Sequence, residues 1–481
     1  MSVDTIAAVA TGAGRAGIGI VRVSGPGVPG IARAIAGREL APREAHYLPF
    51  GDADGTALDV GIALLFEAPN SFTGEHVLEL QGHGGPVVLD LVLSRVLALG
   101  ARAARPGEFS ERAFLNDKLD LAQAEAIADL VESASGAAAR AAVRSLAGDF
   151  SAEVAAVVAE LDALRVWLEA ALDFSDEDID FLSDPDVERR AAGLVARFDA
   201  LLARSEQGRR LREGLDIAIV GVPNVGKSSL LNALAGLERA IVTDVAGTTR
   251  DVLHEDIVLD GVPLHVVDTA GLRESEDPVE REGVVRARRA AAEADHVLLL
   301  VDASEPVLPE GIDELLPEVP RTLVVNKVDL LGAPSAARTS GAGARLDAGT
   351  PDAGEHAVDE PLTEAGVPTI ADMPIETDGP PIAISARTGQ GMDELRAHLL
   401  SLVGRDASIE GIYLARRRHL DALAEARAFA DDALERLREG TMPELAAEEL
   451  RLARQVLERI TGHFDSEDLL GQIFSTFCVG K

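Results

Sequence analysis

A stretch of nine residues near the middle of the chain has the composition and spacing of a phosphate-binding loop. It reads Gly-Val-Pro-Asn-Val-Gly-Lys-Ser-Ser over residues 221–229, follows the apolar run 217–220 and opens the amphipathic segment 230–234. This pattern predicts a strand, a tight loop and the start of a helix. Backbone N–H groups and the positive helix end would then face an anion, Lys227 would reach the β- and γ-phosphates, and the Ser228 hydroxyl would bind Mg²⁺.

Three further short motifs, each at the end of an apolar run, indicate a guanine nucleotide. The Asp-Thr-Ala-Gly motif at 268–271 offers a carboxylate for the magnesium shell and a glycine N–H for the γ-phosphate. In the Asn-Lys-Val-Asp motif at 326–329, the Asp carboxylate can accept from two guanine N–H donors that adenine lacks, while the Lys stem lies along the base. Ser-Ala-Arg at 385–387 offers N–H groups to the guanine oxygen. The motif residues are Asp268, Thr269, Ala270, Gly271, Asn326, Lys327, Asp329, Ser385, Ala386 and Arg387. In this order they predict a GTPase, with its ligand at the carboxyl ends of parallel strands.

The residue after the Asp-Thr-Ala-Gly motif bears on how the attacking water is oriented. Ras-like proteins carry a glutamine there, whereas this chain has Leu272, which cannot orient water. Either hydrolysis is slow or another residue supplies the polar group, and the acidic stretch 274–282 is the first place to look. The Asn224 amide oxygen can hold a monovalent cation against the phosphates, or Asn224 can simply stabilise the turn.

Composition restricts the class of protein. A chain of 481 residues with 47% hydrophobic content predicts two to four packed domains. Because it has neither a long uncharged apolar run nor a basic, apolar amino terminus, we expect a cytoplasmic protein without a signal peptide or membrane span. The single cysteine, Cys478, excludes internal disulfides. The formal charge of -36 argues against nucleic-acid binding over the whole surface, so any RNA contact is local or shared with a partner.

Lysine is rare in this chain, in which almost every basic residue is an arginine. The four lysines are Lys118, Lys227, Lys327 and Lys481. Two of them belong to the nucleotide motifs. The other two are therefore candidates for positions that need a compact ammonium group, unless their placement is a coincidence in an arginine-biased sequence.

The first part of the chain, of about 115 residues, has the pattern of a mixed α/β domain. Strands are predicted over 18–23, 60–66 and 77–81, and a helix over 86–99. The glycine-rich loop 11–17 precedes a strand instead of opening a helix, which excludes a dinucleotide-binding fingerprint.

Three polar residues of this first domain are conspicuous. Arg22 interrupts an apolar strand, and the ordinary explanation is an edge-strand arginine with its head in water. Glu79 alternates with Leu78 and Leu80, which places it on the opposite face of its strand. His83, between glycines, is either a ligand contact or catalytic base, or a loop histidine that caps a turn.

Helical periodicity dominates the segments on both sides of the GTPase motifs. It extends over 119–173, resumes over 187–211 and returns over 413–461. An α/β domain is therefore inserted between two parts of one helical domain. The segment 331–379 is rich in Ala, Gly, Pro, Thr and Asp without periodicity, and we interpret it as a disordered surface insertion whose deletion should leave GTP hydrolysis intact.

The chain resembles, from end to end, the bacterial and organellar tRNA uridine-5-carboxymethylaminomethyl modification GTPases, the MnmE/TrmE type. The segments that carry the resemblance occur in all three domains, and they are 4–8, 19–25, 71–75, 78–85, 105–109, 113–125, 247–251 and 478–481. The resemblance implies a reduced-folate-binding and dimerisation domain over 1–117. It also implies a helical domain over 118–212 and 405–481, with a Ras-like doubly wound α/β GTPase domain inserted over 213–404.

The resemblance further implies roles for individual residues. Arg22, Glu79, Lys118 and the terminal Lys481 would contact the folate, and Glu280 would position the water that Leu272 cannot. Ser228 and Thr249 would hold Mg²⁺. The potassium ligands would be Asn224, Thr243 and the backbone of Val245 and Thr248. The remaining GTP-binding residues would be Val225, Gly226, Ser229, Asp244, Ala246 and Gly247. Cys478 is either a catalytic nucleophile or a structural or substrate-contact residue.

The implied activity is a potassium-activated, magnesium-dependent GTP hydrolysis coupled to tRNA modification. The homodimer would work with an FAD-dependent partner of the MnmG/GidA type, potassium replacing an arginine finger when two GTPase domains meet. It would modify carbon 5 of the wobble uridine, with 5-formyl- or 5,10-methylene-tetrahydrofolate as the one-carbon donor. The alternative is a ribosome-assembly or signalling switch without modification chemistry. That alternative predicts a basic RNA-binding module, whereas the carboxy-terminal helices carry as many acids as bases.

Overall fold

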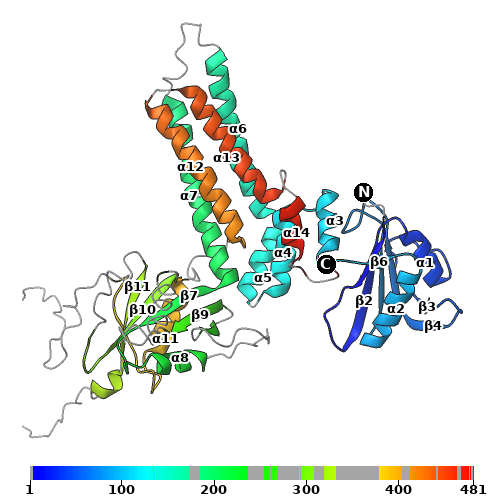
Figure 1. Ribbon diagram of the computed structural model, residues 1–481, viewed down its shortest axis with the longest axis horizontal. Helices are drawn as coiled ribbons and strands as arrows, with labels where there is room; N and C mark the ends of the chain where they lie inside the picture. The colour runs from blue at the N-terminus through cyan, green and yellow to red at the C-terminus, as the bar shows by residue number, and fades with distance from the viewer. Residues whose placement is uncertain are drawn as a thin grey trace, which may run out of the picture. The chain divides into compact units, whose positions relative to one another are not determined.

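The computed structural model describes two compact units of the chain (Figure 1). One unit contains Met1–Arg212 with Ile409–Lys481, and the other contains Glu213–Ser408. The residues described are 4–133, 135–173, 185–236, 254–259, 262–268, 292, 294–307, 319–331, 377, 379–402, 412–439, 442–462, 467–475, 477 and 480. The predicted disordered insertion 331–379 lies outside them apart from its ends. Within them, no helix is both long and apolar enough to cross a membrane.

The amino-terminal part of the first unit is a six-stranded sheet in the order β3-β4-β5-β2-β1-β6. Its strands are β1 (Ile6–Val9), β2 (Ala16–Ser24), β3 (His46–Gly51), β4 (Ala57–Phe66), β5 (Val77–Gly84) and β6 (Arg102–Ala103). Neighbouring strands are antiparallel except β1 and β6. Strand alternation sends Val21, Val23, Leu78 and Leu80 to a core with α1 (Val28–Ala36) and α2 (Pro86–Ala98).

Helix α3 (Glu108–Leu115) contributes to the other face of this sheet. Its Phe109 is fully buried and packs with Ile6 and Ala8 of β1. The sequence predicted β2, β4, β5 and α2 close to their observed bounds, but did not predict β1, α1, β3 or β6. These four are either short or without a strong periodic pattern.

The remainder of the first unit is helical, as predicted. Its helices are α4 (Leu121–Glu132), α5 (Gly136–Ala147), α6 (Asp149–Asp173), α7 (Pro185–Glu213), α12 (Arg417–Glu439), α13 (Pro443–Thr461) and α14 (Glu467–Ser475). Helix α4 begins with a capping box in which Asp120 and Gln123 satisfy each other's backbone N–H groups. Helix α5 ends at Gly148, whose φ of 96° suits a left-handed cap.

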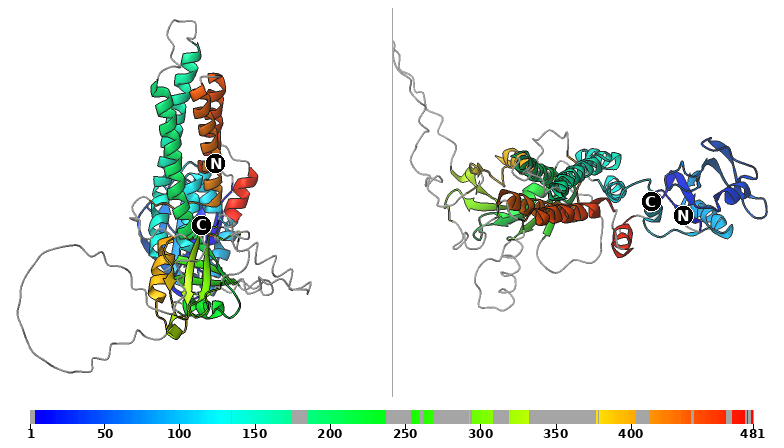
Figure 2. Two further views of the ribbon diagram at one scale, coloured as in Figure 1. Left: turned by 90° about the vertical axis from the view of Figure 1, so that its left-hand side faces the viewer. Right: turned by 90° about the horizontal axis from the view of Figure 1, so that it is seen from above.

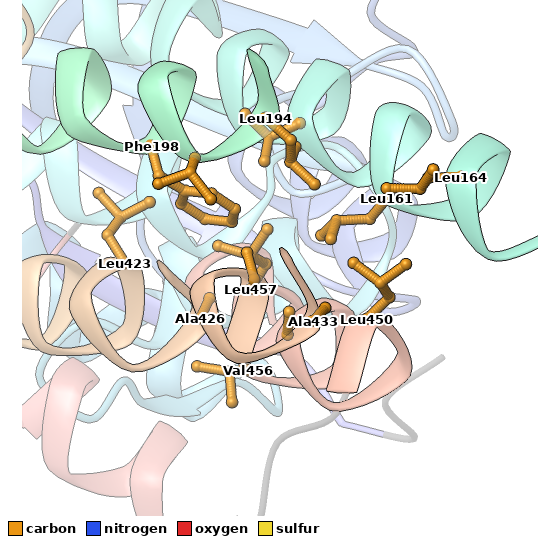
Figure 3. Close-up of a cluster of buried hydrophobic side chains, with 14 of the residues drawn as sticks. Leu161, Leu164, Leu194, Phe198, Leu423, Ala426, Ala433, Leu450, Val456 and Leu457 are labelled. Carbon is orange, nitrogen blue, oxygen red and sulfur yellow. The ribbon is translucent and has the colours of Figure 1, made fainter. Parts of the chain in front are cut away.

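Helices α6, α7, α12 and α13 pack lengthwise around one apolar core (Figures 1 and 2). Leu161 of α6, Phe198 of α7, Leu423 of α12 and Leu457 of α13 point toward one another there (Figure 3). The two parts of the chain that flank the GTPase motifs therefore build a single bundle. Burial of these stripes, with i, i+3 and i+4 spacing, stabilises helices of this length more than intrinsic propensity does.

The second unit is a mostly parallel sheet in the order β12-β11-β10-β7-β9-β8. Its elements are β7 (Leu215–Val220), α8 (Lys227–Ala235), β8 (His254–Leu259), β9 (Val262–Asp268), β10 (His296–Asp302), β11 (Arg321–Asn326), the 3-10 helix η2 (Val328–Leu331), β12 (Ile382–Ala383) and α11 (Met392–Leu402). Only β8 with β9 pairs antiparallel. The strand order reverses direction at β7, where doubly wound sheets bind ligands. The predicted fold class is confirmed.

Candidate functional site

The phosphate-loop motif forms the predicted strand, loop and helix. Strand β7 ends at Val220 and α8 begins at Lys227, with Gly226 as its N-cap at a φ of 104°. A Cβ on Gly226 would lie 2.3 Å from Asn326 Nδ2, and one on Gly221 would lie 2.5 Å from the Leu300 carbonyl oxygen. Both glycines are therefore required for the close approach of the loop to neighbouring strands.

Lys227 lies over the loop that precedes it. Its Nζ donates to the carbonyl oxygens of Gly221 at 2.8 Å and of Val222 at 3.2 Å, and the residue is buried. Ser228 and Ser229 are exposed in the first turn of α8. The ammonium and the Ser228 hydroxyl are thus both held at the helix N-terminus, where an anion is favoured.

The two base-side motifs meet the phosphate loop at the carboxyl ends of β11 and β12. Asn326 Nδ2 donates to the Val225 carbonyl at 2.9 Å, and its Oδ1 accepts from the Ala386 N–H at 3.0 Å. Ser385 Oγ donates to Asp329 Oδ1 at 2.7 Å, which orients that carboxylate. Asn326 is therefore the side chain that joins the three motifs. Arg387 is exposed beside them.

A carboxylate that belongs to none of the sequence motifs completes this arrangement. Lys327 Nζ donates both to the Asn224 carbonyl and to Asp302 Oδ2, each at 2.7 Å. Burial alone would raise the pKa of Asp302, but the hydrogen bonds from Lys327 and Ser304 outweigh it and hold that pKa below its usual value. Its signal in the sequence was a carboxylate at the end of an apolar strand, the same signal that marks Asp268.

The remaining predicted nucleotide and metal residues lie outside the described part of the chain. They are Thr243, Asp244, Val245, Ala246, Gly247, Thr248, Thr249, Thr269, Ala270, Gly271 and Glu280. Asp268 is the last residue of β9, which runs parallel to β7. Its backbone therefore ends at the same edge of the sheet as the phosphate loop.

In the amino-terminal sheet, Arg22 and Glu79 form an ion pair. They are register partners on β2 and β5, and Arg22 Nε donates to Glu79 Oε1 at 3.0 Å. Because β2 lies between β5 and β1, the expectation of an edge-strand arginine is wrong. The guanidinium lies 5.8 Å from the ring centroids of both Phe72 and Phe109. Cation–π contact and the ion pair compensate its loss of water.

The carboxy-terminal tail reaches this ion pair. Arg22 Nη1 donates to the Gly480 carbonyl at 3.3 Å, and a Cβ on Gly480 would lie 2.4 Å from the Val9 carbonyl oxygen. The tail backbone therefore lies directly on β1. Cys478 and Lys481, predicted to act here, lie outside the described residues.

The Lys118 side chain packs against the loop 71–75, which carries Phe72. A Cβ on Gly74, whose φ is 76°, would lie 3.4 Å from Lys118 Cγ. The Asn116 side chain also donates to the Thr73 carbonyl at 2.7 Å. The segment 116–118 thus holds the loop 71–75 beside Arg22.

A buried ionic network below this loop was also missed. Arg112 of α3 donates to Glu75 at 3.0 Å and to Glu108 at 3.1 Å, and Ser24 Oγ donates to Glu75 at 2.7 Å. Each of these four residues is buried. The network ties α3 and the end of β2 to the loop, so it positions the surroundings of Arg22. Arg112 directly precedes the segment 113–125, one of those that carry the family resemblance, but no local sequence pattern indicates its ionic partners.

His83 lies in strand β5 and not in a loop. Its exposed ring accepts or donates a hydrogen bond at 2.7 Å to Asp59 Oδ1, and its backbone N–H donates to Asp59 Oδ2 at 2.8 Å. Burial raises the pKa of Asp59, but the hydrogen bonds from His83 and from the Val60 N–H together outweigh burial and lower that pKa. His83 therefore pairs with the carboxylate of Asp59 on β4.

Family models match both parts of the chain. The model described as the MnmE helical domain matches residues 121–478, and that of the GTP-binding protein TrmE N-terminus matches residues 5–118. Among solved structures, a variant of Era from Aquifex aeolicus bound to GDP and AlF4⁻ is 27% identical, with a TM-score of 0.28. That match covers 45% of this chain and 66% of the other, just under two thirds of its length. The G domain of the T. maritima FeoB iron transporter is 22% identical, with a TM-score of 0.25, and covers 39% of this chain and 98% of the other. On the two family models, which together span nearly the whole sequence, the chain belongs to the MnmE/TrmE family of tRNA-modification GTPases.

Proposed function

We propose that this protein hydrolyses GTP in a potassium-activated reaction that drives modification of tRNA. With an FAD-dependent partner of the MnmG/GidA type, it installs a carboxymethylaminomethyl or aminomethyl group at carbon 5 of the wobble uridine, using a one-carbon unit from a reduced folate. The observation that carries the GTPase part is the junction at Asn326, which bonds to the phosphate loop through Val225 and to the third motif through Ala386.

The residues at the phosphate loop fit a bound Mg²⁺ and K⁺. The exposed Ser228 hydroxyl and Asn224 amide are oxygen ligands, the type that hard cations prefer. Asn224 has a φ of 63°, so the loop turns sharply at this residue. Bound to the Ser228 and Asn224 oxygens, the cations would neutralise charge that develops on the phosphates. Lys227 would bind the phosphate oxygens directly.

Potassium activation is tested by hydrolysis rates in matched K⁺ and Na⁺ buffers. We expect faster turnover in K⁺, and we expect Asn224→Ala to abolish that difference. Equal rates of the unmodified protein in the two salts would sink the cation role of Asn224.

Arg22, Glu79, Lys118 and Phe72 together have the chemistry that a reduced folate requires. The Glu79 carboxylate can accept from pterin N–H groups, and the Arg22 and Lys118 cations can pair with the glutamate carboxylates of the ligand. Phe72 is partly exposed beside Arg22 and offers an aromatic surface for stacking. These groups lie on β2, β5, the loop 71–75 and the segment 116–118 that packs against this loop, so the fold brings them together.

Isothermal titration with 5-formyl-tetrahydrofolate tests the folate assignment. Arg22→Ala should abolish binding while GTP turnover stays near normal. The matched control is Arg33→Ala, because Arg33 is an exposed arginine of α1 that pairs with Glu39. Unchanged folate affinity in Arg22→Ala would count against the site.

An exposed apolar face of the sheet supports the homodimer. Tyr47 of β3 and Ile62 of β4 are register partners, and Val60 is opposite Pro49 two positions further along. Tyr47 is 76% exposed, and Ile62 and Val60 are also exposed. A second copy of the chain would cover this face. Light scattering should give a dimer for the unmodified protein and a shift toward monomer for Tyr47→Asp, and an unshifted mass would contradict this interface.

A further inference from the structure

Asp302, the last residue of β10, lies at the end of the sheet where the nucleotide motifs meet. It is the register partner of Asn326 on β11. The Ala303 N–H that follows it donates to the Asn326 carbonyl at 2.8 Å. Asp302 is therefore fixed by the backbone next to the base-side motif, although it belongs to none of the sequence motifs.

The two carboxylate oxygens of Asp302 have different partners. Oδ1 accepts from the Ser304 N–H at 2.9 Å and from the Ser304 hydroxyl at 2.6 Å. Oδ2 accepts from Lys327 Nζ at 2.7 Å. The Ser304 contacts hold the carboxylate in one rotamer, and that rotamer directs Oδ2 at the ammonium group.

Lys327 is held at both ends of its side chain. Its backbone has a φ of 66°, which lies in the left-handed region. Its ammonium group bridges Asp302 on β10 and the Asn224 carbonyl in the phosphate loop. Without Asp302 the ammonium would keep, among the residues that the structure describes, one neutral acceptor, the Asn224 carbonyl. A flexible four-carbon stem with one acceptor samples several rotamers.

We propose that Asp302 is a positioning residue of the guanine-nucleotide site, which acts through Lys327. It fixes the Lys327 stem as the surface on which the base lies and ties that surface to the phosphate loop. The proposal rests on the proposed binding of GTP. Recognition of the guanine edge belongs to Asp329, and phosphate binding to Lys227 and Ser228, so Asp302 acts mainly on retention of the nucleotide.

Two consequences separate this role from a general structural one. GDP and GTP should be affected equally, because both place a base on the Lys327 stem. The ratio of affinities for GDP and IDP, which differ only in the 2-amino group, should not change, because Asp329 reads that group. The lowered pKa of Asp302 is consistent with a carboxylate that stays ionised at neutral pH.

The test measures release of N-methylanthraniloyl-GDP from the full-length protein by stopped-flow fluorescence. In Asp302→Asn we expect release about tenfold faster, the size expected for loss of a charged hydrogen bond, and a smaller change in the single-turnover rate at saturating GTP. The matched control is Asp295→Asn, since Asp295 precedes the same strand and accepts from the Asp216 N–H at its opposite end. Ser304→Ala, which only releases the Asp302 rotamer, should shift release in the same direction by less.

A double-mutant cycle decides whether Asp302 acts through Lys327. Asp302→Asn combined with Lys327→Met should release the nucleotide no faster than Lys327→Met alone. Additive effects would overturn the proposal. If the wild-type protein binds labelled GDP tightly and neither Asp302→Asn nor Ser304→Ala changes its release, only the role of Asp302 is contradicted. If the wild-type protein binds no labelled GDP, the proposed function is contradicted together with this role.

Discussion

Arg22 on β2 and Glu79 on β5 are opposite each other in the sheet, and the guanidinium also holds the backbone of the carboxy-terminal tail through Gly480. Two residues separated by 458 positions in the sequence are thereby joined in one hydrogen bond. The tail belongs to the second segment of the first unit, Ile409–Lys481. This hydrogen bond therefore connects that segment to the amino-terminal sheet.

Glu79→Gln should weaken reduced-folate binding about tenfold. Glutamine keeps the shape of the side chain but removes the charge that both Arg22 and a pterin N–H group need. Titration calorimetry with 5-formyl-tetrahydrofolate measures the change. Glu39→Gln, which alters an exposed carboxylate paired with Arg33, should bind normally. Equal affinities of the two variants would show that Glu79 does not contact the ligand.

Asp129→Asn should destabilise the helical part of the first unit by about 3–5 kcal/mol. The buried Asp129 carboxylate accepts at 2.7 Å from Arg212 and from Arg416, the residues on either side of the second unit in the sequence. Its loss leaves two partly buried guanidinium groups without this partner. Urea unfolding is followed by Trp167, the only tryptophan of the chain, which packs against the bundle core.

The control for that measurement is Asp199→Asn, because Asp199 is exposed and pairs only at the surface with Arg427. Surface pairs of this kind contribute about 0–1 kcal/mol. If Asp129→Asn unfolds at the same urea concentration as this control, the buried carboxylate does not hold the two chain segments.

Acid should weaken the amino-terminal domain through Glu108. Burial by itself raises the pKa of Glu108, but hydrogen bonds from Arg102, the Arg105 N–H and Arg112 outweigh it and lower the pKa from 4.5 to about 2. Since the folded pKa is depressed, the stabilisation is complete above pH 4.5 and is lost as pH falls toward 2.

Thermal unfolding of the unmodified protein and Glu108→Gln between pH 7 and 3 measures this contribution. The unmodified protein should unfold at the higher temperature at pH 7, and the difference should shrink with falling pH. A difference that is independent of pH would indicate that shape, and not the Glu108 charge, is what matters.

Leu457→Ala should destabilise the bundle by about 2–5 kcal/mol. Leu457 is fully buried at the centre of the core formed by α6, α7, α12 and α13 (Figure 3), so its truncation leaves a cavity. Urea unfolding followed by Trp167 reports the loss. Val166→Ala, at a position that is 58% exposed on α6, should change little. A similar loss in both variants would contradict the observed core.

The parts that could be predicted from the sequence are those encoded by local spacing. The phosphate loop could be predicted because its residues are contiguous. The bundle helices could be predicted because their apolar residues recur with helical spacing, which a packed core stabilises. The order of strands in a sheet is a long-range property, so the central position of Arg22 could not be deduced from alternation. Asp302 was missed for the same reason, because its partner Lys327 follows another strand, β11, and no local pattern pairs them.

The measurement that tests the central claim most directly is mass spectrometry of wobble nucleosides in tRNA from cells that lack this gene. Complementation with the unmodified gene should restore the 5-substituted uridines, and complementation with Arg22→Ala should not, although that variant still hydrolyses GTP. If 5-substituted uridines persist in the deletion strain, or if Arg22→Ala restores them fully, the account of a folate-dependent tRNA-modification GTPase is contradicted.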